Sequence, residues 1–317
     1  MRIIEKIKEM RTAVSSARGR GATVAFVPTM GGLHQGHLLL VRSARRFAGE
    51  DGLVVVSVFV NPVQFSEDED LGAYPRDFGR DAALLKEAGV QIIFSPSVEE
   101  IYPDGFSTRV DTGGIAESSL AGRLCGASRP GHFSGVATIV TKLFNIVAPD
   151  VAVFGLKDYQ QQLIIKKLVK DLDMDIEIVT VETVREGDGL AMSSRNAYLD
   201  EAAREAALCV PRSLELACRL FAGGASSLDE IKQEMRALVE ARQGVVVDYI
   251  IICEPETLEE ATVLRAGLLV AIAVRVALAG RGAAKGLYGK GAEVATAQSV
   301  RLIDNCILET RRVKLNG

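Results

Sequence analysis

Histidine and cysteine are both scarce in this sequence, and neither forms the clusters that hold metal ions. Among 317 residues there are three histidines and five cysteines, with no CxxC pair and no cysteine cluster near a histidine. A zinc site needs several such ligands at short, regular spacings. We therefore predict no metal held by the protein alone, and we interpret the cysteines as reduced packing residues of a cytoplasmic protein.

Long apolar runs and an excess of positive charge are also missing. The apolar stretch 263–279 is interrupted by Arg265 and Arg275, so it falls short of the roughly 18 to 20 uninterrupted residues of a membrane helix. The formal net charge of −4 gives no basic excess for binding nucleic acid. The first ten residues contain neither a hydrophobic signal core nor a small-residue cleavage site. These absences predict no membrane partner, no nucleic acid partner and a cytoplasmic location.

Apolar residues are abundant and are arranged in a regular alternation. They make up 48% of the chain, which is ample for a large core. Strand-like runs alternate with helix-patterned stretches, as in a parallel sheet covered by helices on both faces. We predict an α/β fold with a Rossmann-like doubly wound parallel sheet. The expected strands are 22–27, 53–60, 91–94, 151–154 and 176–181.

The pattern changes after residue 184. Glycines at 187 and 189 flank an aspartate and predict a hinge there. We therefore expect a first domain at 1–184 that binds the substrates, and a smaller C-terminal α+β domain at 185–317 that closes over the site. In the second domain we expect helices at 201–221 and 227–242, and strands at 245–253 and 301–308.

The second domain also contains a glycine-rich stretch at 279–293, AGRGAAKGLYGKGAE. A phosphate-binding P-loop would need glycine where Ala284 stands, and serine or threonine where Gly291 stands. No GxGxxG follows a strand, which argues against a dinucleotide-binding fingerprint. We expect a flexible loop at 279–293.

The most informative motif is PTMGGLHQGH at 28–37, directly after the first expected strand. Its paired glycines allow a tight turn, and the N–H groups of a helix beginning near Leu33 would point at whatever occupies that turn. His34 and His37 are three residues apart on one helical face, where each can donate a hydrogen bond to a phosphate oxygen. The segment therefore predicts a phosphate site.

The segment FVNPVQF at 59–65 includes the end of the apolar strand 53–60 and carries the amides of Asn61 and Gln64 just after it. Neutral amides suit the hydroxyl and carboxylate groups of a small polar substrate. An equally good interpretation of the segment alone is a turn stabilised by Asn61 itself.

The segment FGLKDYQQ at 154–161 again has the order of strand, glycine and helix. Gly155 permits close approach, Lys157 offers a cation for phosphate, and Gln161 would share the helical face of Lys157. Asp158 could simply cap the helix, which is the commoner role for aspartate at such a place.

The last such segment is VREGDGLAMSSRN at 184–196. Ser193 and Ser194 precede Arg195, whose permanently charged guanidinium can hold two phosphate oxygens at once. Taken together, the four segments indicate a nucleoside triphosphate bound without a P-loop, beside a pocket for a small polar acid. With no nucleophile elbow in the chain, nucleotidyl transfer is the predicted chemistry.

These segments, in this order, resemble the pantothenate synthetases (pantoate–β-alanine ligases), a family of nucleotidyltransferases related to class I aminoacyl-tRNA synthetases. RPGHFSGVATIVTKLFN at 129–145 and RLIDN at 301–305 add to the resemblance, which runs over nearly the whole chain. It implies ATP-driven condensation of pantoate with β-alanine through a pantoyl adenylate, with Mg²⁺ on the phosphates and a homodimeric enzyme. His37 would be the general acid or, as we favour, a protonated imidazole that stabilises phosphate charge.

The resemblance also implies the roles of individual residues. Gln64 and Gln161 would hold pantoate, with Gln64 also near β-alanine, and His34, His37, Lys157 and Arg195 would act in catalysis. The expected ATP-binding residues are Met30, Gly31, Gly32, Leu33, His34, Gln35, Gly36, His37, Gly155, Leu156, Lys157, Asp158, Val184, Met192, Ser193, Ser194 and Arg195.

The sequence departs from the family pattern in a few places and leaves alternative functions open. Gly32 stands where alanine is common, Leu156 stands where a polar residue is frequent, and the stretch before RLIDN is unusually rich in glycine. One alternative is another nucleotidyltransferase of the superfamily, acting on a phosphorylated alcohol, although the neutral Gln64 and Gln161 argue against it. The other is a nucleotide-binding module without catalytic activity.

Overall fold

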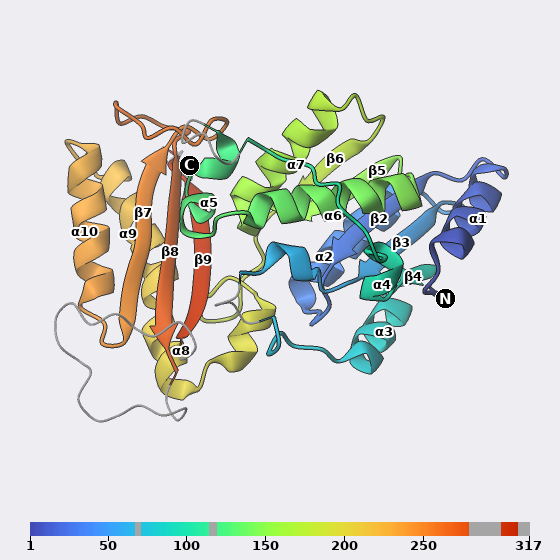
Figure 1. Cartoon of the computed structure of the whole chain (residues 1–317). Coiled ribbons are helices and arrows are strands. Elements are labelled where there is room, and N and C mark those ends of the chain that lie inside the picture. The colour runs from blue at the N-terminus through green and yellow to red at the C-terminus, as the bar shows by residue number, and fades with distance from the viewer. Residues whose placement is uncertain (67–70, 114–118, 279–298, 310–317) are drawn as a thin grey trace, which may run out of the picture. The chain divides into compact units, whose positions relative to one another are not determined.

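The computed structural model describes residues 1–66, 71–113, 119–278 and 299–309. The chain divides into two compact units, which are described separately below (Figure 1). Unit 1 contains residues 1–184 and 192–194, and unit 2 contains residues 185–191 and 195–317. The expected flexible loop at 279–293 lies outside the described residues.

Unit 1 is built on a six-stranded sheet in the order β1-β4-β3-β2-β5-β6. Every neighbouring pair is parallel, which confirms the predicted doubly wound parallel sheet. All five expected strands are present, and only the short edge strand β1 was not predicted. The strands are β1 (Arg2–Ile4), β2 (Val24–Thr29), β3 (Leu53–Val58), β4 (Ile92–Phe94), β5 (Val151–Gly155) and β6 (Glu177–Val181).

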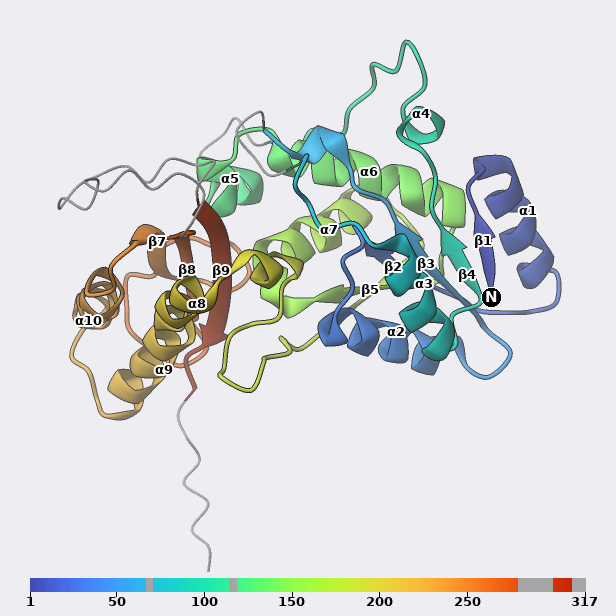
Figure 2. The same cartoon turned by 90° about the horizontal axis from the view of Figure 1, so that it is seen from below.

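Helices cover both faces of this sheet (Figures 1 and 2). Side chains of β2 alternate between the faces: Ala25 and Val27 pack with Val41 of α2, whereas Phe26 meets Phe144 of α6 edge to face. The α-helices are α1 (Ile7–Arg18), α2 (Gln35–Ala48), α3 (Phe78–Glu87), α4 (Val98–Ile101), α5 (Cys125–Ser128), α6 (His132–Val147) and α7 (Tyr159–Asp171). The 3₁₀ turns are η1 (Pro62–Gln64), η2 (Leu120–Gly122) and η3 (Leu156–Asp158).

The strand order places the predicted motifs next to one another. β2 lies between β3 and β5, and all three strands run in the same direction. The segments after these strands therefore leave the same edge of the sheet, at the place where the strand order reverses. Ligands of open α/β sheets bind at such a switch point.

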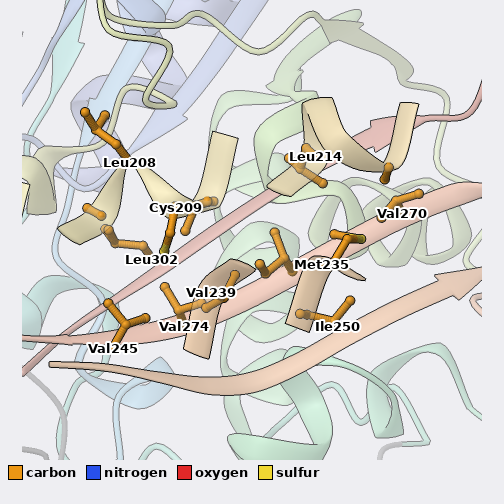
Figure 3. Packing of buried hydrophobic residues seen from close by; sticks show 14 of the residues in the cluster. Leu208, Cys209, Leu214, Met235, Val239, Val245, Ile250, Val270, Val274 and Leu302 are labelled. Atoms are coloured by element: carbon orange, nitrogen blue, oxygen red, sulfur yellow. The ribbon is translucent and has the colours of Figure 1, made fainter. Parts of the chain in front are cut away.

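Unit 2 is a small antiparallel sheet, β7-β8-β9, packed against helices. Figure 3 shows its core, in which Met235 and Val239 of one helix face Val270 and Val274 of the central strand. This is the expected smaller α+β unit. Its elements are α8 (Glu201–Ala207), α9 (Cys209–Ala222), α10 (Leu228–Glu240), β7 (Val245–Cys253), β8 (Leu269–Ala277) and β9 (Ser299–Ile307), and the 3₁₀ turn η4 (Ser194–Tyr198) joins it to unit 1.

Some expected boundaries are wrong for identifiable reasons. The single helix predicted at 201–221 is two helices, α8 and α9, with Leu208 between them. Pro211 lacks an N–H and its ring crowds the preceding turn, so it lies in the first turn of α9 instead of inside a longer helix. β8 occupies the apolar run that was considered only as a membrane span. Within the described ranges, no helix has the length and apolar character needed to cross a membrane.

Candidate active site

The two neighbouring histidines cap the N-terminus of α2 with their own side chains. His34 is the N-cap residue, and its Nδ1 accepts a hydrogen bond from the backbone N–H of Gly36 at 3.1 Å. Nδ1 of His37 accepts from the backbone N–H of His34 at 3.3 Å. In a neutral imidazole, a nitrogen that accepts leaves the hydrogen on the other one. Both rings therefore carry N–H on Nε2, a donor suited to a phosphate oxygen.

The lowered pKa of His37 argues against the protonated ring that we expected. The pKa of His37 is lowered from 6.5 to about 3, first by burial and then by the neighbouring ring of His34, which is centred 4.1 Å away. The charge of Asp158 raises this pKa and that of Lys157 lowers it, but both effects are smaller. His37 is a neutral donor, because a charged ring would lose more hydration free energy on burial than the neighbouring charges would restore.

The glycine turn before α2 is closed by a carboxylate of the protein. Gly31 and Gly32 have φ angles of 83° and 62°, in the left-handed region that favours glycine. The N–H groups of Gly32 and Leu33 each donate to the carboxylate of Asp81 on α3 at 2.8 Å. We expected the N–H groups here to point at a ligand, and α2 to begin near Leu33. Instead Asp81 binds them, and α2 begins at Gln35.

The fourth motif lies against the first. A Cβ added to Gly32 would stand 3.1 Å from Cβ of Ser194, and one added to Gly36 would stand 3.9 Å from Cβ of Met192. The hydroxyl of Ser194 lies 3.0 Å from the phenol oxygen of the buried Tyr74.

Met192 N–H donates to the carbonyl of Val184 at 2.9 Å. Val184 and residues 192–194 therefore belong to the same unit as the histidines, whereas Arg195 belongs to unit 2. The place of Arg195 at the site stays a prediction.

The third motif supplies a cation and a carboxylate at the end of β5. Lys157 Nζ lies 3.7 Å from Oδ1 of Asp158, and the effect of both charges on His37 indicates that they are near α2. Asp158 occupies the N-cap position of α7, yet its side chain makes no capping hydrogen bond. The simple capping role is thus not observed. Gln161 lies in the first turn of α7, while Lys157 precedes that helix in η3, so the two residues are not in one α-helix as we expected.

The second motif places the amide of Gln64 beside the first motif. Gln64 is buried at the end of η1, and its Nε2 donates to Sδ of Met30 at 3.0 Å. Asn61 Nδ2 donates to Gln64 Oε1 at 3.0 Å and to the carbonyl of Gly135 at 3.2 Å. Tyr102 donates its hydroxyl hydrogen to Oδ1 of Asn61 at 2.8 Å. Asn61 thus acts as a support for Gln64.

Several supporting residues were not found from the sequence. Asp81, Tyr74 and Tyr102 carry no local signal, because each acts on a segment far away in the chain. His132 stood inside a recognised segment, but no role followed from its spacing. Among the described residues, no cluster of His, Cys, Asp and Glu could hold a metal ion by itself.

The arrangement has a defined chemical character. The neutral Nε2–H donors of His34 and His37 follow the end of β2, and the Lys157 ammonium follows the end of β5. The Gln64 amide contacts the histidine motif through Sδ of Met30. Such donors strengthen as negative charge grows on phosphate oxygens. Neutral amides next to them suit the hydroxyl and carboxylate groups of a small polar acid.

Comparison with known proteins agrees with this character. The sequence profile of one family, described as pantoate-beta-alanine ligase, matches residues 2–307. The pantothenate synthetase of Pelotomaculum thermopropionicum is 49% identical over 276 residues, covering 87% of this chain and 95% of the relative. That of Moorella thermoacetica is 44% identical over 309 residues, covering 98% of this chain and 99% of the relative.

Solved structures show the same likeness. The pantothenate synthetase of Thermus thermophilus is 42% identical with a TM-score of 0.83, over 97% of this chain and 99% of that one. The pantoate-beta-alanine ligase of Francisella tularensis, complexed with beta-gamma ATP and beta-alanine, is 33% identical with a TM-score of 0.73, over 98% of both chains.

Proposed function

This chain belongs to the pantoate-beta-alanine ligase family, and we propose that its site joins pantoate to β-alanine with cleavage of ATP to AMP and pyrophosphate. The observation that carries the proposal is the junction of Gln64 with the histidine motif through Met30. This contact supports the proposal, because a neutral amide that could bind the acid lies next to donors that could bind the phosphates. A regulatory module would have no need for the additional amide.

In the first step, the pantoate carboxylate attacks the α-phosphorus of ATP and pyrophosphate leaves. Negative charge then grows on the phosphoryl oxygens and on the leaving group. Nε2–H of His34 and His37, together with the Lys157 ammonium, stabilises that charge more in the transition state than in the ground state. Because His37 is neutral in this structure, we assign it hydrogen-bond donation and not proton transfer.

In the second step, the amine of β-alanine attacks the acyl carbon of pantoyl adenylate and AMP leaves. No covalent bond to the enzyme is needed. An acyl adenylate hydrolyses readily, so exclusion of water is useful here. We assign that exclusion to closure of the 185–317 domain, which would also bring in the Arg195 guanidinium as an anion clamp.

The remaining binding roles follow the motifs. Gln64 and Gln161 hold pantoate, with Gln64 also close to β-alanine. The residues assigned to ATP are Met30, Gly31, Gly32, Leu33, His34, Gln35, Gly36, His37, Gly155, Leu156, Lys157, Asp158, Val184, Met192, Ser193, Ser194 and Arg195. The contacts of Asp81 limit Gly32 and Leu33 to shaping the turn, since their N–H groups are already bonded.

Mg²⁺ is part of the proposal as an ion carried by the triphosphate. Mg²⁺ usually binds through one or two carboxylates plus substrate phosphates, not in an all-protein cage. The half-exposed carboxylate of Asp158 beside Lys157 fits that pattern. When bound, the ion would neutralise phosphate charge, and Asp158 is the residue that would hold it.

A homodimer and a cytoplasmic location complete the proposal. The homodimer follows from the family resemblance. The location follows from the sequence, whose five cysteines form neither a CxxC pair nor a dense framework, as is typical of a reducing compartment.

The test is to mix the protein with Mg-ATP and pantoate, with and without β-alanine, and to follow pyrophosphate, AMP and pantothenate by mass. Pantoate-dependent exchange of pyrophosphate into ATP, and pantothenate once β-alanine is added, would establish both steps. Exchange only with another acceptor would show a different nucleotidyltransferase. ATP binding without pyrophosphate release would show a non-catalytic module.

A matched pair of variants tests the role of His37 in the same assay. Nε2 of glutamine can take the place of Nε2–H of histidine, whereas alanine has no donor. If His37 is a neutral donor, His37→Gln retains far more exchange activity than His37→Ala. Equal loss in both variants would favour a protonated His37, and full activity in His37→Ala would remove it from the mechanism.

A further inference from the structure

We propose that the first turn of α6 positions Gln64, with His132 holding its backbone and Gly135 setting the direction of its side-chain amide, so that Gln64 offers an N–H donor to pantoate. This inference rests on the proposed function, in which Gln64 binds pantoate. It makes His132 and Gly135 positioning residues, because they act through Gln64.

The backbone of Gln64 is held by the ring of His132. His132 is the first residue of α6 and is buried, and its Nδ1 lies 2.7 Å from the carbonyl oxygen of Gln64. Its Nε2 lies 3.0 Å from Nη1 of Arg129. A guanidinium can only donate, so Nε2 is the accepting nitrogen and Nδ1 carries the hydrogen. His132 therefore donates from Nδ1 to the Gln64 carbonyl.

Gly135 lets α6 approach η1 more closely than any other residue would. A Cβ at Gly135 would stand 2.5 Å from the carbonyl oxygen of Val63 and 2.7 Å from Cα of Gln64. Both are backbone atoms, so neither can turn aside to make room. The backbone of α6 therefore packs directly against the backbone of Val63 and Gln64, and His132 donates a hydrogen bond to the Gln64 carbonyl.

The carbonyl group of the same glycine determines which end of the Gln64 amide lies beside Met30. A backbone carbonyl can only accept, so the contact of Gly135 O with Asn61 identifies the atom there as Nδ2. Asn61 Oδ1 then accepts from Tyr102, whose pKa is raised by burial so that its hydroxyl keeps its hydrogen. The second hydrogen on Asn61 Nδ2 goes to Gln64 Oε1. With Oε1 engaged, Nε2 is the end of Gln64 that lies beside Met30.

This polarity matches the substrate chemistry. The hydroxyl and carboxylate oxygens of pantoate accept hydrogen bonds, and a fixed NH₂ group serves them without reorganising. An amide free to rotate would present its oxygen about as often, which repels a carboxylate. A donor that is already held in this orientation improves binding, because no free energy is then spent on orienting the amide when pantoate binds.

The experiment measures Michaelis constants for pantoate and for ATP in pantoate-dependent pyrophosphate exchange, with no β-alanine present. The variants are His132→Ala, His132→Asn and Gly135→Ala. Asparagine places an amide N–H where Nδ1–H of histidine stands, so His132→Asn keeps the donor that His132→Ala loses. Thermal unfolding of each variant checks that it is folded.

We expect His132→Ala and Gly135→Ala to raise KM for pantoate about tenfold, the equivalent of one lost hydrogen bond. We expect KM for ATP to change less than about twofold, and His132→Asn to stay close to wild type. If His132→Ala does not fold, the two Michaelis constants are compared in Gly135→Ala and His132→Asn instead.

Equal rises in both Michaelis constants would overturn the inference, because they indicate general damage and not misplacement of Gln64. An unchanged KM for pantoate in Gly135→Ala, or a His132→Asn variant as impaired as His132→Ala, would overturn it too. Failure of the proposed function looks different, because wild type itself would then show no pantoate-dependent exchange.

Discussion

Asp81 on α3 accepts a hydrogen bond at 2.8 Å from the backbone N–H of Leu33, 48 residues earlier in the chain. Its other oxygen accepts from Gly32 at the same distance. A buried carboxylate with two charge-assisted hydrogen bonds holds the turn in one shape before any substrate arrives. The N–H groups of Gly32 and Leu33 are therefore not available to an anion, and in the proposed function that role belongs to the imidazoles that follow the turn.

Replacing Asp81 with asparagine is expected to loosen this turn. One of the two N–H groups would then face an NH₂ group, and an unsatisfied buried donor costs about 1–3 kcal/mol of folding free energy. KM for ATP should rise as well, because His34 and His37 follow the turn. Denaturant unfolding and exchange kinetics measure the two effects.

The control is Asp77→Ala, which removes the N-cap of the same helix, where Asp77 accepts from the N–H of Arg80. Loss of that cap costs about 1 kcal/mol and should leave KM for ATP unchanged. A similar rise of KM in both variants would show that α3 as a whole, and not the carboxylate of Asp81, supports the site.

The lowered pKa of His37 makes a prediction about stability and pH. Its pKa is about 3 in the folded chain and 6.5 as an ordinary value, so between these values the unfolded chain binds more protons. The free energy of unfolding therefore falls as the pH falls below 6.5, by up to about 1.4 kcal/mol per pH unit from this one group. Above 6.5 the group contributes its full stability.

His37→Gln removes this titration and leaves all carboxylates in place. The difference in unfolding free energy between wild type and variant should shrink, or change sign in favour of the variant, as the pH is lowered from 6.5 towards 4. Denaturant melts at several pH values measure it. Parallel curves over that range would contradict a buried neutral His37.

Two adjacent glutamines of α7 are expected to have different roles, Gln160 in stability and Gln161 in substrate binding. Gln160 is buried and accepts from the N–H of Cys125 while donating to the carbonyls of Leu120 and Arg123. Gln161 is only partly buried. We expect Gln160→Leu to lower the unfolding free energy by about 1–3 kcal/mol, since it orphans buried backbone groups.

Gln161→Leu should instead raise KM for pantoate and leave the unfolding free energy almost unchanged. Exchange kinetics and denaturant melts on the two variants measure both properties. If the effects were reversed, or if both variants lost stability only, Gln161 would have no place in the pantoate site.

Asp304 of the RLIDN segment forms a bidentate ion pair with Arg185, with N–O distances of 2.6 and 3.1 Å. Arg185 begins the short hairpin in which it pairs with Ala191, directly before Met192. We expect Asp304→Asn to lower unfolding stability and also to raise KM for ATP, because the hairpin leads into the residues assigned to ATP.

The matched control is Asp248→Asn. Asp248 pairs with Arg275 and Arg301 on the same three-stranded sheet, but neither partner belongs to the hairpin. It should cost stability without changing KM for ATP. If Asp304→Asn behaved in the same way, its ion pair would be purely structural.

Much of the fold and part of the site could be predicted from the chain alone. The five expected strands of unit 1 were identified because apolar runs, glycine turns and helix periodicity are local properties. The motifs after β2, β3 and β5 were recognised for the same reason, since each is a strand end followed by a turn. The binding roles of their residues stay predictions. The split of 201–221 at Leu208 was missed, although Pro211 was a visible local signal.

By itself, the sequence determined which segments follow the carboxyl ends of the parallel strands and which donors they carry, because strand, turn and helix signals lie within a few neighbouring residues. Only the tertiary structure decided the charge of His37, the closing of the glycine turn by Asp81 and the direction of the Gln64 amide. The physical reason is that pKa and hydrogen-bond polarity depend on burial and on partners from distant segments. His132 and Gln64 lie 68 positions apart, and no local pattern joins them.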